Sequence, residues 1–234
     1  MVPASCAEHI FRTKRGVAAG NTLDSALDES HVVGLCAGAS SVAPALCYYQ
    51  APSGLSKDHQ TMLCEGATRV YTDGSGSRPV EKSAAAVCAR SGLEHNLDGG
   101  VVVHLCRSHV VVEGDDVGPT NGPIDCAIET PYGFSPQDVL ALCSGASSSS
   151  PSACAKQVGG RFSNSQKASV CAGASDDVPA RCIEHLPSTL SQDDAVRLCG
   201  DAKSLTPAYC ARQKGRVSEA DIEQCKKEVS EPSR

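Results

Sequence analysis

A stretch of thirteen residues with two cysteines recurs along this chain and constrains its fold more than any other feature. Each copy holds its cysteines eleven positions apart, with a proline three residues before the second one. The step from Cys143 to Cys171 to Cys199 is 28 residues each time. A fixed step of this length indicates a repeat array, in which each unit buries its apolar face only against its neighbours. The four copies are Leu35–Cys47, Leu142–Cys154, Val170–Cys182 and Leu198–Cys210.

Each repeat predicts two short helices. The A-type helix ends at the first cysteine and begins after a Ser or Asp cap eight residues earlier, and a glycine follows two residues past the cysteine in most copies. The B-type helix begins at the proline, where the missing N–H costs nothing, and Thr206 is expected to cap the last of these. Both types are shorter than the roughly 12–15 residues at which an isolated helix is marginal in water. The cap–cysteine pairs are Ser56/Cys64, Asp98/Cys106, Ser135/Cys143, Ser163/Cys171 and Ser191/Cys199.

The cysteine spacing leaves two pairing schemes open. Pairing each A-type cysteine with the next B-type cysteine leaves Cys6 and Cys225 without partners within the chain. Pairing each B-type cysteine with the next A-type cysteine uses all fourteen, at separations of 15–18 residues except for one of 30. The second scheme is favoured, because the start of one helix lies beside the end of the other in an antiparallel pair. It gives Cys6–Cys36, Cys47–Cys64, Cys88–Cys106, Cys126–Cys143, Cys154–Cys171, Cys182–Cys199 and Cys210–Cys225.

The sequence therefore predicts an all-α fold, a single array of short helical hairpins stapled by disulfides and stacked as an elongated rod or solenoid over residues 1–234. Three Gly-, Pro- and Ser-rich insert loops, at 11–29, 71–80 and 108–123, interrupt it. Pro3–Cys6 matches Pro44–Cys47, so the chain opens in the second half of a repeat, and we expect a fragment of a longer repeat protein. The predicted hairpins span about 3–38, 44–66, 79–108, 123–145, 151–173, 179–201 and 207–225.

Composition places the chain in an oxidising compartment. Fourteen cysteines accompany no Trp, three Phe and five Tyr, so the core is thin and needs covalent support. The absence of a C-x-x-C motif argues against a zinc finger or a redox centre. We expect an extracellular or cell-surface protein.

Other chemistries find little support in the sequence. A pI near 5.6 without a basic patch argues against nucleic acid, and no apolar run approaches a membrane span. His104, Cys106 and His109 resemble a metal cluster, but Cys106 belongs to the repeat, so a surface interpretation is preferred. The acidic loops Asp73–Ser77 and Glu113–Asp116 lack the EF-hand spacing. We predict no catalytic residues, no metal and no cofactor.

One serine-rich segment is a candidate for modification. A Ser-rich run beside proline is typical of O-glycosylated segments in secreted proteins. A flexible loop with a helix cap explains the same residues equally well. The candidate glycosylation sites are Ser147, Ser148, Ser149, Ser150 and Ser152.

These observations favour a non-catalytic structural protein of a surface appendage, filament or matrix. Its partners would be copies of itself or neighbouring repeats of a larger assembly. The alternative is a secreted adhesion module that binds glycan or protein through the insert loops Tyr71–Val80 and Ser108–Pro123. A secreted enzyme is the third interpretation.

Overall fold

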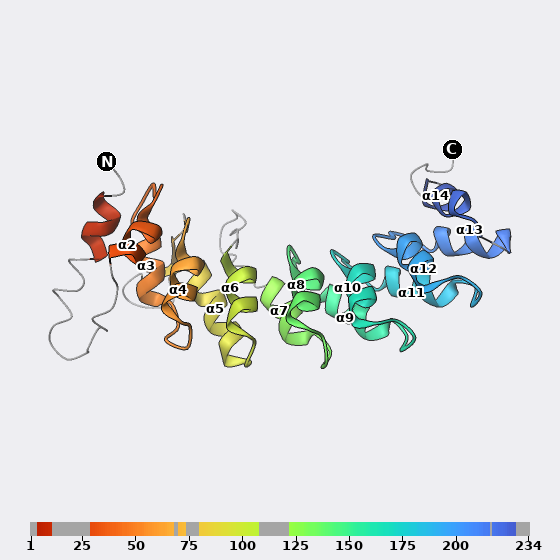
Figure 1. Cartoon of the computed structure of the whole chain (residues 1–234), viewed down its shortest axis with the longest axis horizontal. Coiled ribbons are helices and arrows are strands. Elements are labelled where there is room, and N and C mark those ends of the chain that lie inside the picture. The colour runs from red at the N-terminus through yellow and green to blue at the C-terminus, as the bar shows by residue number, and fades with distance from the viewer. Residues whose placement is uncertain are drawn as a thin grey trace. The chain divides into compact units, whose positions relative to one another are not determined.

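The computed structural model describes residues 4–10, 29–67, 70–73, 80–107, 122–215 and 217–227 (Figure 1). The chain divides into two compact units, Met1–Thr120 and Asn121–Arg234. Both consist of short helices in consecutive pairs, so the predicted all-α fold of tandem hairpins is confirmed.

The first unit contains three hairpins and one small β-hairpin. Its first B-type helix covers residues 4–10. The remaining elements are α2 (Glu29–Cys36), α3 (Ala43–Gln50), α4 (Lys57–Cys64), β1 (Val70–Asp73), β2 (Val80–Ser83), α5 (Ala84–Glu94) and α6 (Gly99–Arg107).

The second unit contains four hairpins of nearly constant length. The B-type helices are α7 (Gly122–Glu129), α9 (Ser150–Gln157), α11 (Val178–His185) and α13 (Thr206–Lys214). The A-type helices are α8 (Pro136–Cys143), α10 (Asn164–Cys171), α12 (Gln192–Cys199) and α14 (Glu219–Lys227).

The helices of each unit form two rows. In the second unit α8, α10, α12 and α14 pack on one another in sequence order, and α7, α9, α11 and α13 do the same. In the first unit α2, α4 and α6 form one row, and α3 packs on α5 in the other. Each hairpin joins the rows, since its B-type helix contacts the A-type helix that follows. A residue therefore packs mainly against its own hairpin and the adjacent ones, as in solenoid repeats.

Seven disulfides join the two rows, one in each hairpin. They connect the seven pairs that the spacing favours, with Cα–Cα distances of 5.5–5.8 Å, and no cysteine is free. A crosslink over a loop of this length contributes on the order of 3 kcal/mol.

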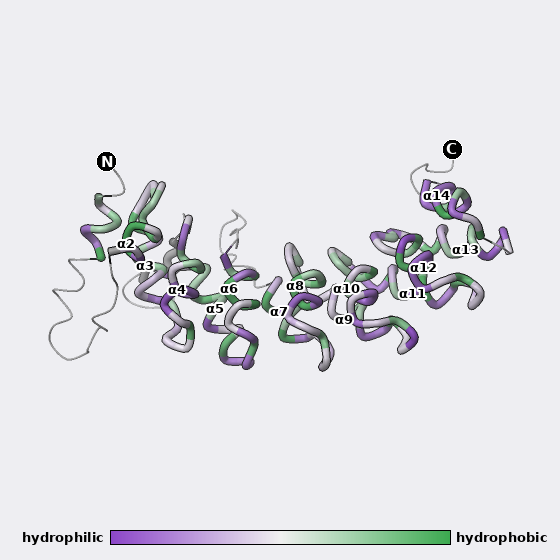
Figure 2. The backbone as a smooth tube through the Cα atoms, viewed as in Figure 1, coloured by the Kyte–Doolittle hydropathy of each residue, from purple (hydrophilic) through white to green (hydrophobic). Residues whose placement is uncertain are grey.

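The core between the rows is thin. In six hairpins the disulfide is buried together with the aliphatic residue that precedes its A-type cysteine. Small residues of the B-type helix, such as Ala45, Ala180 and Ala208, are buried beside it. The six aliphatic residues are Leu35, Leu63, Leu105, Leu142, Val170 and Leu198. Hydrophobic and hydrophilic stretches alternate within the hairpins, without one long apolar segment (Figure 2). The disulfides thus occupy space that bulky side chains fill in ordinary domains.

The two helix types begin in different ways. In α8 and α10 the caps Ser135 and Ser163 form full capping boxes with Asp138 and Gln166. Four B-type helices, α3, α9, α11 and α13, lack a side-chain cap at the preceding residue. In each, a hydroxyl or carboxylate two residues before the helix accepts its first N–H. The acceptors are Ser41, Ser148, Asp176 and Ser204.

The prediction that Thr206 caps its helix is wrong. Thr206 is the first residue of α13, and its N–H donates to the hydroxyl of Ser204 at 3.3 Å. Ser204, two residues before the helix, accepts this N–H because its side chain closes a compact turn with the backbone.

A β-hairpin is the one type of element that the sequence analysis did not predict. Strands β1 and β2 pair antiparallel, with Val70 opposite Ser83 and Asp73 opposite Val80. The strands include both ends of the insert predicted at 71–80, of which residues 74–79 lie outside the described part of the chain. The strands include β-branched and aromatic residues, which favour extended backbone. Helix α5 follows β2 directly and, at 11 residues, is longer than α3.

Candidate functional site

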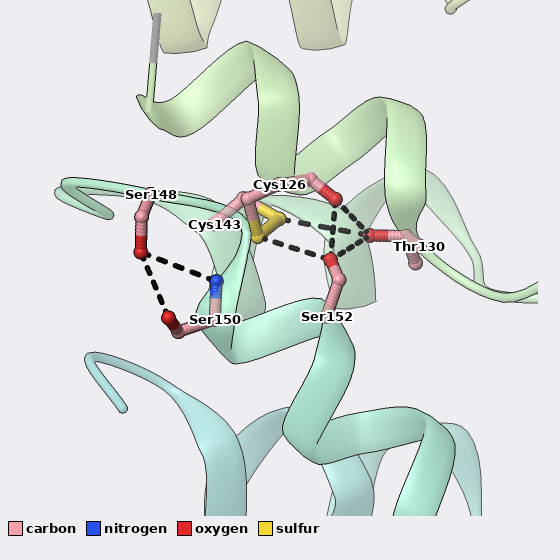
Figure 3. Close-up of a disulfide and its surroundings, with 6 residues drawn as sticks. All are labelled: Cys126, Thr130, Cys143, Ser148, Ser150 and Ser152. Atoms are coloured by element: carbon pink, nitrogen blue, oxygen red, sulfur yellow. Dashed lines mark hydrogen bonds between the residues drawn. A yellow bond between two sulfur atoms is a disulfide. The ribbon is translucent and has the colours of Figure 1, made fainter. Parts of the chain in front are cut away.

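The serine-rich segment lies in the turn between α8 and α9. Gly145 begins the turn with φ +78°. The hydroxyl of Ser148 accepts the N–H of Ser150 at 3.2 Å and lies 2.9 Å from the Ser150 hydroxyl (Figure 3). Ser147 and Ser148 are exposed, and Ser149 and Ser150 are half-buried. The segment is therefore an ordered turn, in which Ser148 shapes the backbone before α9.

Ser152 is buried, which corrects its assignment as a candidate glycosylation site. Its side chain is 0 % exposed and donates a hydrogen bond to the carbonyl oxygen of Cys126. Its hydroxyl also lies 3.3 Å from the sulfur of Cys126 and 3.1 Å from the hydroxyl of Thr130 (Figure 3). A glycosyltransferase cannot reach this oxygen in the folded chain, because the hydroxyl lies between two packed B-type helices beside a disulfide.

Consecutive hairpins of the second unit are joined by polar contacts between equivalent helices. The hydroxyl of Ser165 donates to Asp138 at 2.7 Å, and Gln166 donates to Asp193 at 2.9 Å. Both pairs are separated by 27 residues, one less than the repeat period. We call these two pairs, together with Lys156–Glu129 at 2.6 Å in the other row, the inter-hairpin ladder. No repeated pattern in the sequence indicates this ladder, because its members differ from one repeat to the next.

The ladder lowers the pKa of two carboxyl groups. The hydrogen bond from Ser165 is the main cause for Asp138, and the hydroxyl and N–H of Ser135 add to it against the effect of partial burial. The hydrogen bond and positive charge of Lys156 lower the pKa of Glu129. Both groups are therefore ionised over a wider pH range than free carboxyls are.

The first unit carries a hollow of about 680 Å³ beside the end of α3. It is open to solvent and is lined among others by Tyr49, Pro52, Arg90 and Glu94. The Tyr49 hydroxyl donates to the carbonyl of Ile10 at 2.6 Å, and Arg90 donates to the carbonyl of Gln50 at 3.4 Å. Its lining includes one cation, Arg90, and one anion, Glu94, beside apolar surface.

The other candidate sites are placed only in part. The insert loops 11–29 and 108–123 lie almost wholly outside the described residues, as do His109 and the acidic loop at 113–116. Cys106 is joined to Cys88 rather than to a metal. Within the ranges that the structure describes, no three metal-ligating side chains lie together, and no helix is long and apolar enough to cross a membrane.

The disulfides are the best-defined chemical feature of the chain. All fourteen cysteines are paired in crosslinks whose sulfurs lie in buried residues. Such a set forms and persists in an oxidising environment, typical of secreted proteins. No protein-family model matches this chain, and no curated protein or solved structure is significantly similar to it.

Proposed function

We propose that this chain is a non-catalytic structural component of an extracellular scaffold, such as a filament, a matrix or a surface appendage. The observation that carries the proposal is the repetition of one disulfide-stapled hairpin, each packed mainly against its neighbours in sequence. An array of this kind can be lengthened one hairpin at a time without a new core. Length and durability are the properties that a scaffold requires.

The contacts between hairpins support this proposal. The inter-hairpin ladder consists of short polar side chains and one exposed ion pair, Lys156–Glu129. Surface pairs of this kind contribute about 0–1 kcal/mol each, so they define register more than stability. We propose that neighbouring copies of the chain add to the array through contacts of the same kind.

A secreted binding module is the second candidate, and the hollow beside Tyr49 and Arg90 is the observation that favours it. A ligand there would meet a donor on Arg90, an acceptor on Glu94 and the apolar surface of Pro52. Glycans, which carry both hydroxyls and C–H faces, have matching chemistry.

Electron microscopy of the oxidised, purified chain over a range of concentrations tests the two candidates. Ordered assemblies that grow with concentration are expected for a scaffold. If the chain stays monomeric at every concentration, the scaffold proposal is rejected. Glycan-array binding by the wild type that is lost in R90A/E94Q then supports the binding module. R181A/E184Q is the matched control, because it removes the same two charges from α11, whose residues do not line this hollow.

A further inference from the structure

The disulfide connectivity determines which parts of the chain transmit tension. Each staple closes the loop between a B-type cysteine and the following A-type cysteine, and in the second unit these loops span 17, 17, 17 and 15 residues. A force applied along the chain crosses each hairpin through the S–S bond, because that covalent path is far shorter than the loop. The loops therefore carry no tension while the disulfides are intact.

The segments that do carry tension are the short connectors between hairpins. The connectors Cys143–Cys154, Cys171–Cys182 and Cys199–Cys210 are 11 residues long. A fully extended connector of this length spans at most about 36–40 Å. The three connectors together hold half as many residues as the four loops that the staples bypass.

We propose that the array is an extension-limited mechanical element. Under tension neighbouring hairpins part from one another, each releasing only its connector, while the disulfide holds the two helices of a hairpin together. The proposal rests on the scaffold function for the source of the tension. The length of chain released on stretching depends only on which cysteines the disulfides join, and not on the scaffold function.

The contacts at the two kinds of boundary differ in strength. Between hairpins every described contact is non-covalent, from the exposed pair Lys156–Glu129 to the buried hydrogen bond that Ser152 donates to the carbonyl of Cys126. Within a hairpin the covalent staple remains after every non-covalent contact has broken. The weaker boundary therefore yields first. Because the staple keeps the loop ends together, a released hairpin can re-form without paying the entropy of closing its loop again.

Single-molecule stretching of the full oxidised chain between terminal handles tests the proposal. The variant C154A/C171A puts a 17-residue loop back into the force path. Its final contour length should exceed that of the wild type by about 50–55 Å, from about 3.3–3.6 Å per residue less the 5.7 Å that the disulfide already spans. This gain does not require the altered hairpin to fold, because covalent connectivity alone determines the final length.

Two further variants act as matched controls. C182A/C199A frees another 17-residue loop and should give the same gain, whereas C210A/C225A frees 15 residues and should give about 7 Å less. In the wild type we expect a series of small steps. One cooperative rupture of the whole array, or variants that gain no length, would overturn the proposal. A chain that forms no assemblies but gives these lengths contradicts only the scaffold function.

Discussion

Asp201 adopts the left-handed backbone conformation that Gly173 adopts 28 residues earlier. Their φ angles are +62° and +68°, and both residues follow the A-type cysteine by two positions. Gly38, Gly66 and Gly145 occupy the same place in other hairpins, with φ between +69° and +78°. Of the five described turns with this conformation, only this one has a residue with a Cβ. There an L-residue costs roughly 1–2 kcal/mol, less for Asp than for most.

We expect the substitution D201G to stabilise the turn that joins α12 to α13. Relief of the left-handed strain is worth about 1 kcal/mol for Asp, and the greater freedom of glycine in the unfolded chain offsets about half of it. The net gain is about 0.5 kcal/mol, seen as slower amide exchange in α12 and α13. D177G is the control, because Asp177 has φ −89° and gains nothing from glycine. Equal gains from both substitutions would show that strain at residue 201 is not the cause.

The buried hydroxyl of Ser152 and the half-buried hydroxyl of Thr130 should be energetically coupled. Both lie within hydrogen-bond distance of the carbonyl oxygen of Cys126 and of each other. S152A removes one hydrogen bond, for a cost of about 1 kcal/mol. T130V alone should cost a similar amount, and the double variant less than the sum. Denaturant unfolding of the four oxidised proteins forms the double-mutant cycle, and strict additivity would contradict the shared network.

The repeat explains why most of the fold could be predicted from the sequence. Cysteines, helix caps and prolines recur with the repeat. Each copy alone predicts a hairpin only weakly, but the seven copies together indicate the same fold. The period says nothing about residues outside it, and for this reason the strands at Val70–Asp73 and Val80–Ser83 were missed. Side-chain networks such as Ser165–Asp138 depend on spatial neighbours that no local pattern identifies.

Ser152 was misjudged although the repeats contain the relevant signal. Two positions before the B-type cysteine, three other hairpins carry Ala45, Ala180 and Ala208, each fully buried. Aligned with them, Ser152 occupies a core position, whereas its neighbours Ser147 and Ser148 belong to the exposed turn. The Ser-rich composition suggested the same role for all five serines, but Ser152 is buried, whereas Ser147 and Ser148 are exposed.

The ion pair between Lys214 of α13 and Asp221 of α14 should persist well below the pH at which free carboxyl groups are protonated. The hydroxyl and N–H of Ser218 and the ammonium group of Lys214 lower the pKa of Asp221 to about 2. A lowered folded-state pKa means that this stabilisation is present above the unfolded value of about 3.9 and is lost only as the pH falls toward 2. Titration of the Asp221 carboxyl by NMR should give a midpoint near 2, and S218A should raise it. A midpoint near 4 in the wild type would contradict the network.

Among the described glycines, Gly122 is the one at which an added methyl group would meet the closest backbone atoms. A Cβ at this residue would collide with the carbonyl oxygen of Ala146 and the backbone of Ser147, which cannot move aside as a flexible side chain can. Alanine is favoured over glycine in helices by about 1 kcal/mol, but overpacking against a fixed backbone costs about 1–3 kcal/mol.

The clash is therefore expected to exceed the gain in helix propensity, and G122A should lower the stability of the hairpin of α7 and α8. Gly160 provides the matched control, since a Cβ there meets nothing within 4 Å and its φ is not positive. G160A should leave stability unchanged or raise it slightly. Amide exchange in α7 and α8 reports both effects. Unchanged protection in G122A would mean that the turn between α8 and α9 can move away from α7, so that this contact does not hold the two hairpins in register.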